Sequence, residues 1–173
     1  MAVDIGKLFE KEMQGVFDAL KDSNLIGWHR LADTGSAGGS FIQAQPSDYL
    51  LALPPGSRSP LNEQRLLFVE VKASEANDFL TRKAMKPSQR GAICYYRQVL
   101  KLPYLVIFYA AHLGQLQVWD GAAVPGTGKL DKLHLLTSLD GAGHGKTLNR
   151  SKVAEFLSEW FQLPEKSGIL AAL

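Results

Sequence analysis

The chain has 173 residues, of which 46% are hydrophobic and 21% are charged, with 19 Lys and Arg against 17 Asp and Glu. These values exclude a disordered or fibrous chain, and the length predicts one globular domain. Cys94 is the single cysteine, which excludes an intramolecular disulfide and favours a reducing compartment. The most apolar run, residues 102–111, is too short to cross a bilayer, and the sequence does not open on a secretory signal pattern. We therefore expect a cytoplasmic protein without membrane association.

The first third of the chain predicts one helix and three strands. Apolar residues recur at helical spacing over residues 4–22, with Lys and Glu between them, which is typical of an amphipathic helix. Residues 25–31 predict a strand, and the Gly- and Ser-rich residues 33–45 predict a loop. Residues 48–53 and 65–73 predict two more strands, because the Pro- and Gly-rich residues between them favour turns.

A second helix is predicted to open near Pro87 and to end before Pro103, with Cys94 as a small core residue on its apolar face. Residues 104–110 form a continuous apolar run, which predicts a buried strand. Residues 115–119 predict a short edge strand and residues 133–136 another strand, and Ser151 is expected to cap a last helix.

This order of elements, α-β-β-β-α-β followed by C-terminal decoration, indicates an α/β fold with a mixed central sheet flanked by helices. We expect a single domain over residues 1–173. Its core spans about residues 5–120, and residues 121–173 form a loop-rich extension and a C-terminal helix.

The segment with the clearest chemistry is the strand that contains Glu70 and Lys72. Side chains alternate between the two faces of a strand, so Glu70 and Lys72 share one face while Val69 and Val71 share the other. Charged groups on so apolar a strand require partners, because burial of an unpaired charge is costly. A simple Glu–Lys ion pair at a strand end is the structural alternative.

Asp48 begins the preceding strand, so a hairpin between the two strands would bring its carboxylate beside Glu70. Two adjacent carboxylates repel each other unless a cation lies between them, and Mg²⁺ is the hard cation that oxygen ligands favour. Lys72 could then hold an attacking water or stabilise charge on a phosphate. The trio Asp48, Glu70 and Lys72 therefore predicts the centre of an active site.

The pattern Asp48…Glu70-Val71-Lys72 on adjacent strands, after an acidic first helix, resembles the PD-(D/E)xK nuclease superfamily. Within it, the chain is most similar to Holliday-junction resolvases of the RecU and archaeal Hjc kinds. Four further segments are similar to theirs, namely Gly6 to Glu10 on the first helix, the strand and loop from Arg30 to Ser40, the pair Asp48-Tyr49, and Lys86 to Gln89 at the start of the second helix.

The resemblance implies a restriction-endonuclease-like core and a Mg²⁺- or Mn²⁺-dependent endodeoxyribonuclease. The implied metal ligands are Asp48, Glu70, the backbone carbonyl of Val71 and Glu10, with Glu12 as the alternative to Glu10. Gln89 would orient a phosphate or the attacking water. The resemblance further implies a homodimer that acts in DNA recombination or repair, in a bacterial cell or a phage-infected host.

Candidate DNA contacts come from two segments. Seven basic residues against two acids between Lys72 and Lys101 could steer a polyanion to one face. From this stretch and the preceding loop we expect phosphate contacts, since most protein–DNA hydrogen bonds go to the backbone. The candidates are Arg30, Ser36, Ser40, Lys83, Lys86 and Arg90.

Departures from the resolvase pattern leave alternatives open. Ser47 separates Pro46 from Asp48, and the connection at residues 54–64 is too short for the stalk of RecU. The alternatives are a phage or bacterial DNA-processing or restriction-type endonuclease without junction specificity, and a catalytically inactive DNA-binding module. Residues 141–147 approach a phosphate-binding loop, but Asp140 replaces its first Gly, so no nucleotide cofactor is expected. The four histidines show no zinc-ligand spacing.

Overall fold

The computed structural model describes residues 4–31, 45–57, 61, 64–127 and 130–164. The predicted loop at residues 33–45, with Ser36 and Ser40, lies outside the described residues apart from Gln45. The helices and strands are, in chain order, α1 (Ile5–Asp22), β1 (Gly27–Arg30), β2 (Tyr49–Ala52), β3 (Leu66–Ser74), η2 (Arg82–Ala84), α2 (Pro87–Ile93), η3 (Cys94–Val99), β4 (Tyr104–Ala110), β5 (Gln115–Asp120), η4 (Gly121–Ala123), η5 (Lys132–His134), β6 (Leu135–Leu139), β7 (Gly143–His144), β8 (Thr147–Leu148) and α3 (Arg150–Trp160).

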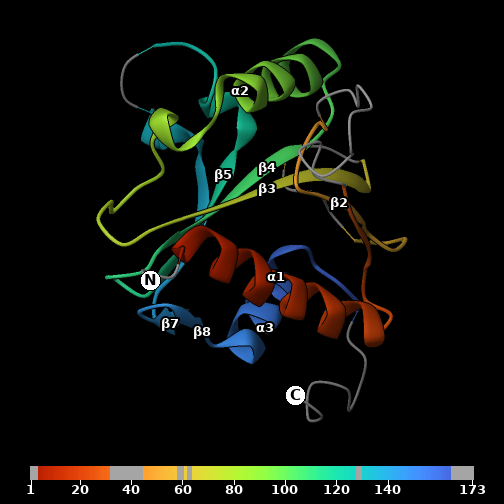
Figure 1. Ribbon diagram of the computed structural model, residues 1–173. Helices are drawn as coiled ribbons and strands as arrows, with labels where there is room; N and C mark the ends of the chain where they lie inside the picture. The colour runs from red at the N-terminus through yellow and green to blue at the C-terminus, as the bar shows by residue number, and fades with distance from the viewer. Residues whose placement is uncertain (1–3, 32–44, 58–60, 62–63, 128–129, 165–173) are drawn as a thin grey trace, which may run out of the picture.

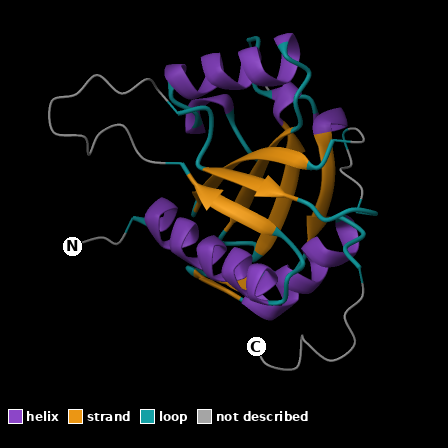
Figure 2. Ribbon diagram, turned by 90° about the vertical axis from the view of Figure 1, so that its right-hand side faces the viewer, coloured by secondary structure: helices purple, strands orange, loops and turns teal. Residues whose placement is uncertain are grey.

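Six strands form one mixed sheet in the order β1-β2-β3-β4-β5-β6. Strands β3 and β4 run parallel, and every other neighbouring pair is antiparallel. Helices α1 and α3 lie on one face of the sheet and α2 lies on the other, as the two views at right angles show (Figures 1 and 2). The prediction of a mixed sheet flanked by helices is confirmed. No helix in the described ranges is both long and apolar enough to cross a membrane.

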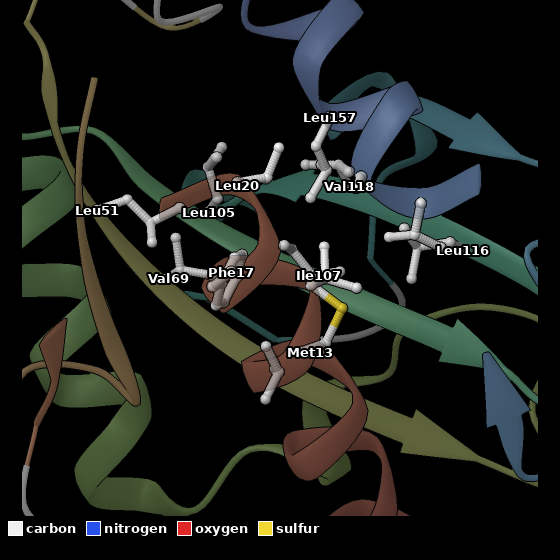
Figure 3. Close-up of a cluster of buried hydrophobic side chains, with 14 of the residues drawn as sticks. Met13, Phe17, Leu20, Leu51, Val69, Leu105, Ile107, Leu116, Val118 and Leu157 are labelled. Carbon is white, nitrogen blue, oxygen red and sulfur yellow. The ribbon is translucent and has the colours of Figure 1, made fainter. Parts of the chain in front are cut away.

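Helix α1 forms where the apolar periodicity predicts it. The Asp4 carboxylate accepts a hydrogen bond from the Gly6 backbone N–H at 2.9 Å and so caps the first turn. The buried stripe of the helix packs against the sheet and α3, where Met13 and Phe17 meet Val69, Ile107 and Leu157 (Figure 3). This large cluster holds α1 and α3 onto one face of the sheet.

A smaller apolar cluster lies on the opposite face, beneath α2. It contains residues from β4, β5, α2 and the loops around them, namely Leu80, Met85, Ile93, Tyr104, Val106, Phe108, Ala110, Trp119, Ala123 and Val124. Because β4 is buried on both faces, its seven residues are all inaccessible. The predicted buried strand is therefore confirmed.

The second helix differs from its prediction in its second half. Helix α2 continues as a π-helical segment, η3, in which Cys94 is only partly buried and Val99 is 63% exposed. Within η3, Tyr96 still packs against the smaller cluster, whereas Val99 lies in solvent. The prediction of Cys94 as a core residue is wrong.

Two other predictions near the C-terminus are corrected. β5 is not an edge strand, because β6 pairs with its outer side, and β6 spans Leu135–Leu139 instead of residues 133–136. The last helix is capped by Asn149, whose side chain accepts from the Lys152 N–H at 3.1 Å, and not by Ser151. Residues beyond 121 thus supply the sheet edge and a core helix.

Candidate active site

The site begins where β2 stops pairing with β3. The last pair of the ladder is Tyr49 with Val69. One residue earlier, the Asp48 carboxylate accepts the next β3 N–H, that of Val71, at 2.9 Å. The Asp48 side chain therefore takes the place of a strand partner and is fixed beside Glu70 and Lys72.

The backbone of Val71 faces the same opening. The N–H and C=O of one strand residue point to the same side, as the paired bonds of an antiparallel ladder require. Since the Val71 N–H points toward Asp48, its carbonyl points past the end of β2 as well. The side chain of Val71 is buried in the cluster under α1. This carbonyl is thus an oxygen donor beside the carboxylates.

Glu70 is the most deeply buried charged group of the site, with 1% of its side chain exposed. Its carboxylate accepts from Lys72 Nζ at 2.5 Å and from the Gln89 amide, and the Tyr104 hydroxyl oxygen lies 3.4 Å away. Burial, together with the nearby charge of Asp48, raises its pKa to about 7, although Lys72 acts in the opposite direction. The single positive charge of Lys72 therefore does not balance the negative charges of Glu70 and Asp48.

Lys72 lies between the two carboxylates, 2.5 Å from Glu70 and 3.8 Å from Asp48. Burial lowers its pKa, but Glu70 and Asp48 outweigh that effect, so the pKa is raised above the ordinary value. Lys72 therefore carries a proton at neutral pH. In this state it can donate a hydrogen bond or stabilise negative charge, but it cannot act as a base.

Gln89 connects the site to the start of α2. Its side-chain oxygen accepts from the Lys86 N–H at 3.0 Å, and its side-chain N–H donates to Glu70. The first bond fixes the orientation of the amide, so the second reaches Glu70 with a donor and not an acceptor. The structure thus brings Gln89 to the predicted site, as an orienting contact of Glu70.

These groups line a cleft of about 660 Å³. Glu10 on α1 lines it too, and its carboxylate lies 3.5 Å from the Arg30 guanidinium. Lys86 lines the opposite side, ahead of α2. The cleft therefore combines an acidic floor with basic side chains contributed by α1, β1 and the segment before α2.

The donor set of the floor suits a hard divalent cation. Asp48, Glu70 and the Val71 carbonyl are all oxygen donors, and the raised pKa of Glu70, caused first by burial and then by the charge of Asp48, shows that an additional cation would stabilise its charged form. Across the described residues, however, no three His, Cys, Asp or Glu side chains gather as a group that could hold a metal. The expected convergence of Glu10 with the other two carboxylates is thus not seen in this geometry, in which Glu10 is paired with Arg30.

Other predicted residues lie apart from the cleft. Glu12, the alternative to Glu10, forms a two-point ion pair with Arg150 on α3. Lys83 is exposed on η2 outside the cleft lining, and Arg90 lines a separate hollow of about 290 Å³. Within the predicted basic stretch, Arg97 pairs with Asp120.

Tyr104 is a site residue that the sequence did not indicate. Its hydroxyl donates to the Pro46 carbonyl at 2.6 Å, and it lies 3.4 Å from Glu70. Burial, and then the charge of Glu70, raises its pKa well above 10, so the hydroxyl stays protonated. It thereby anchors the segment that leads into Asp48.

Comparisons with known proteins give little further guidance. No model of a known family matches the chain, and no curated protein matches its sequence. Among solved structures it is similar to Hjc, a Holliday junction resolvase from the archaeal hyperthermophile Archaeoglobus fulgidus. The TM-score is 0.43 at 12% identity, over 84% of this chain and 98% of that chain. This distant similarity does not by itself establish a shared activity.

Proposed function

We propose that the chain is a metal-dependent nuclease that hydrolyses DNA phosphodiester bonds in this cleft. The observation that carries the proposal is the group formed by Asp48, Glu70 and Lys72, in which a buried carboxylate and a second carboxylate share one lysine. A purely structural ion pair would match one acid with one base. The surplus of negative charge favours a site that takes up an additional cation.

The metal would be held by Asp48, Glu70 and the Val71 carbonyl, with Glu10 directly or through water. When bound, Mg²⁺ or Mn²⁺ makes a water ligand more acidic and neutralises charge that develops on the scissile phosphate. A movement of Glu10 away from Arg30 would be needed for a direct contact, because the two are paired.

The side chains of the protein have separate tasks in this proposal. Protonated Lys72 donates to the attacking water or to a phosphate oxygen, which stabilises the additional negative charge of the transition state. Gln89 holds the Glu70 carboxylate in place through its fixed amide. Tyr104 holds the backbone at Pro46, two residues before Asp48, and so fixes the approach of that carboxylate.

Branched DNA is the substrate that we propose more specifically, with a homodimer that cuts two strands. This part rests on the resemblance of the Asp48…Glu70-x-Lys72 pattern and its flanking segments to junction resolvases. The second candidate is a nuclease without junction specificity. It is favoured by the length of the connection between β2 and β3, which is too short for the stalk of RecU.

The test is cleavage of a labelled four-way junction beside a linear duplex and a single strand of matched sequence, with Mg²⁺ and with a chelator. We expect Mg²⁺-dependent cleavage that is fastest on the junction, and a dimer in sedimentation at micromolar concentration. Equal cleavage rates on all three substrates would support the nuclease activity and contradict the junction specificity. Binding of DNA without cleavage, in Mg²⁺ or in Mn²⁺, would instead support the catalytically inactive DNA-binding module.

A further inference from the structure

The rim of the cleft carries basic side chains in addition to those already discussed. Lys7 and Lys11 on α1 line it, together with Arg30 and Lys86. Both α1 lysines are exposed. Among the described residues, neither of them, nor Lys86, lies within salt-bridge distance of a carboxylate. Within the part of the chain that the structure describes, these three cations therefore have no ion-pair partner.

Several basic side chains elsewhere are engaged by the fold. Arg97 and Arg150 each form a two-point ion pair, and Lys146 pairs with Glu75. Arg82 donates to three backbone carbonyls in the segment after β5, and Lys152 donates to the Asp140 carbonyl. In contrast to these five basic side chains, which serve the fold, Lys7, Lys11 and Lys86 have no carboxylate partner among the described residues.

The positions of Lys7 and Lys11 are unfavourable for α1 itself. Lys7 is in the first turn, which contains no acid, close to the positive end of the helix dipole. Lys11 follows one turn later on the same face, and like charges at this spacing cost about 0.2–0.5 kcal/mol. A helix selected for stability alone would favour acids in its first turn. An anionic ligand would offset this repulsion.

We propose that Lys7 and Lys11 bind the phosphate backbone of the DNA strand that enters the cleft, so that this strand runs along α1. The four-residue spacing separates the two positions by about 6 Å along the helix axis, so their flexible side chains can reach neighbouring phosphates. Lys86, on the side of α2, contacts the strand from across the acidic floor. The inference rests on the proposed nuclease function and adds the surface that orients its substrate.

The test is DNA binding by the double variant Lys7→Ala/Lys11→Ala over a range of salt concentrations. Ca²⁺ replaces Mg²⁺, so that the metal site is filled while little DNA is cleaved. Each lost phosphate contact lowers the slope of log K against log salt by about 0.9 for duplex or about 0.7 for single-stranded DNA. We expect the slope to fall by about 1.4–1.8 and affinity to fall roughly 10- to 100-fold at about 0.1 M salt. Thermal stability should hold or rise, because the charge repulsion in the first turn is relieved.

The matched control is Lys21→Ala/Lys132→Ala, which removes two exposed lysines outside the cleft lining, one of them from the last turn of α1. It should keep the wild-type slope. An equal fall in slope in both variants would mean that only net charge matters and would overturn the inference.

An unchanged slope in Lys7→Ala/Lys11→Ala, with a wild type that binds and cleaves DNA, would overturn the inference alone. A wild type that neither binds nor cleaves DNA would overturn the proposed function together with it. A fall in melting temperature without a change in slope would assign the two lysines a structural role.

Discussion

The two faces of the sheet use the same strand for different purposes. Toward α1 and α3, β3 presents Val69 and Val71 to a large apolar cluster without buried charge. Toward α2, the alternate residues Glu70 and Lys72 emerge beside a smaller cluster and meet Asp48. One face therefore supplies most of the buried apolar contact, and the other carries a charge arrangement that costs stability. The alternation of side chains along β3 is enough to separate the apolar core from the charged site.

The largest stability effect should come from the α1 face. Phe17 is fully buried and makes an edge-on ring contact with Tyr49, at 5.3 Å between centroids. Phe17→Ala should lower the free energy of unfolding by about 3–5 kcal/mol, because it leaves a cavity in a packed core. Phe79→Ala is the control, since Phe79 is 37% exposed and its ring lies under the Lys132 ammonium, 4.1 Å from the ring centroid, and it should lose about 1 kcal/mol or less. Denaturant unfolding measures both, and equal losses would contradict the assignment of the main core.

On the α2 face, Lys72→Ala should lower turnover by about 10²–10³-fold, because it removes a positioned donor to transition-state charge. DNA affinity in Ca²⁺ should stay close to that of the wild type. Lys83→Ala, which removes an equal charge outside the cleft lining, should leave turnover unchanged. If Lys72→Ala lost affinity and kept its turnover, Lys72 would be a phosphate contact and its proposed role would be wrong.

Glu70→Gln should stabilise the metal-free protein as pH rises. The folded pKa of Glu70, about 7, lies above its ordinary 4.5. The contribution of Glu70 to the free energy of unfolding is therefore fully present below pH 4.5 and is lost as pH rises through about 7. The shift corresponds to about 3 kcal/mol. Gln does not titrate, so the variant lacks this loss. Its free energy of unfolding should equal that of the wild type at about pH 4 and exceed it by about 3 kcal/mol at about pH 8. Unfolding in a chelator at both values measures the difference, and an advantage independent of pH would refute the shift.

The smallest effect should come from Tyr104→Phe. The hydroxyl is the donor to the Pro46 carbonyl, so its loss leaves a partly buried acceptor unsatisfied at a cost of about 1–3 kcal/mol. The melting temperature should fall by several degrees, at about 2–4 °C per kcal/mol for a protein of this size. Tyr95→Phe, at a residue that is 52% exposed, is the matched control and should melt like the wild type. Identical melting of both variants would show that the Pro46 contact does not contribute.

The sequence predicted the centre of the candidate site because its geometry follows from one strand pairing. Period-two alternation puts Glu70 and Lys72 on one face, and antiparallel pairing of β2 and β3 brings Asp48 to them. Tyr104 could not be predicted, since β4 is apolar throughout and its pattern does not reveal which residues face the site. Its contacts depend on the parallel register of β3 and β4, in which Tyr104 is the partner of Phe68.

The sequence does not distinguish residues of similar chemistry that lie close together. Lys83 and Lys86 lie three positions apart, and the turn between η2 and α2 decides which of them lines the cleft. Asn149 and Ser151 are both good helix caps, and only the backbone geometry distinguishes them. β5 was expected at the edge because the half-exposed residues of β6 give only a weak strand pattern.

The central claim is that Asp48 and Glu70 form the divalent-metal site of a nuclease. Its most direct test is the rate of Mg²⁺-dependent cleavage of labelled DNA by the wild type and by Glu70→Gln, with melting curves to show that both are folded. The account predicts cleavage by the wild type that a chelator abolishes, and no detectable cleavage by Glu70→Gln at saturating Mg²⁺. Cleavage by Glu70→Gln at a rate near that of the wild type would contradict the account, as would a folded wild type that cleaves no DNA in Mg²⁺ or Mn²⁺.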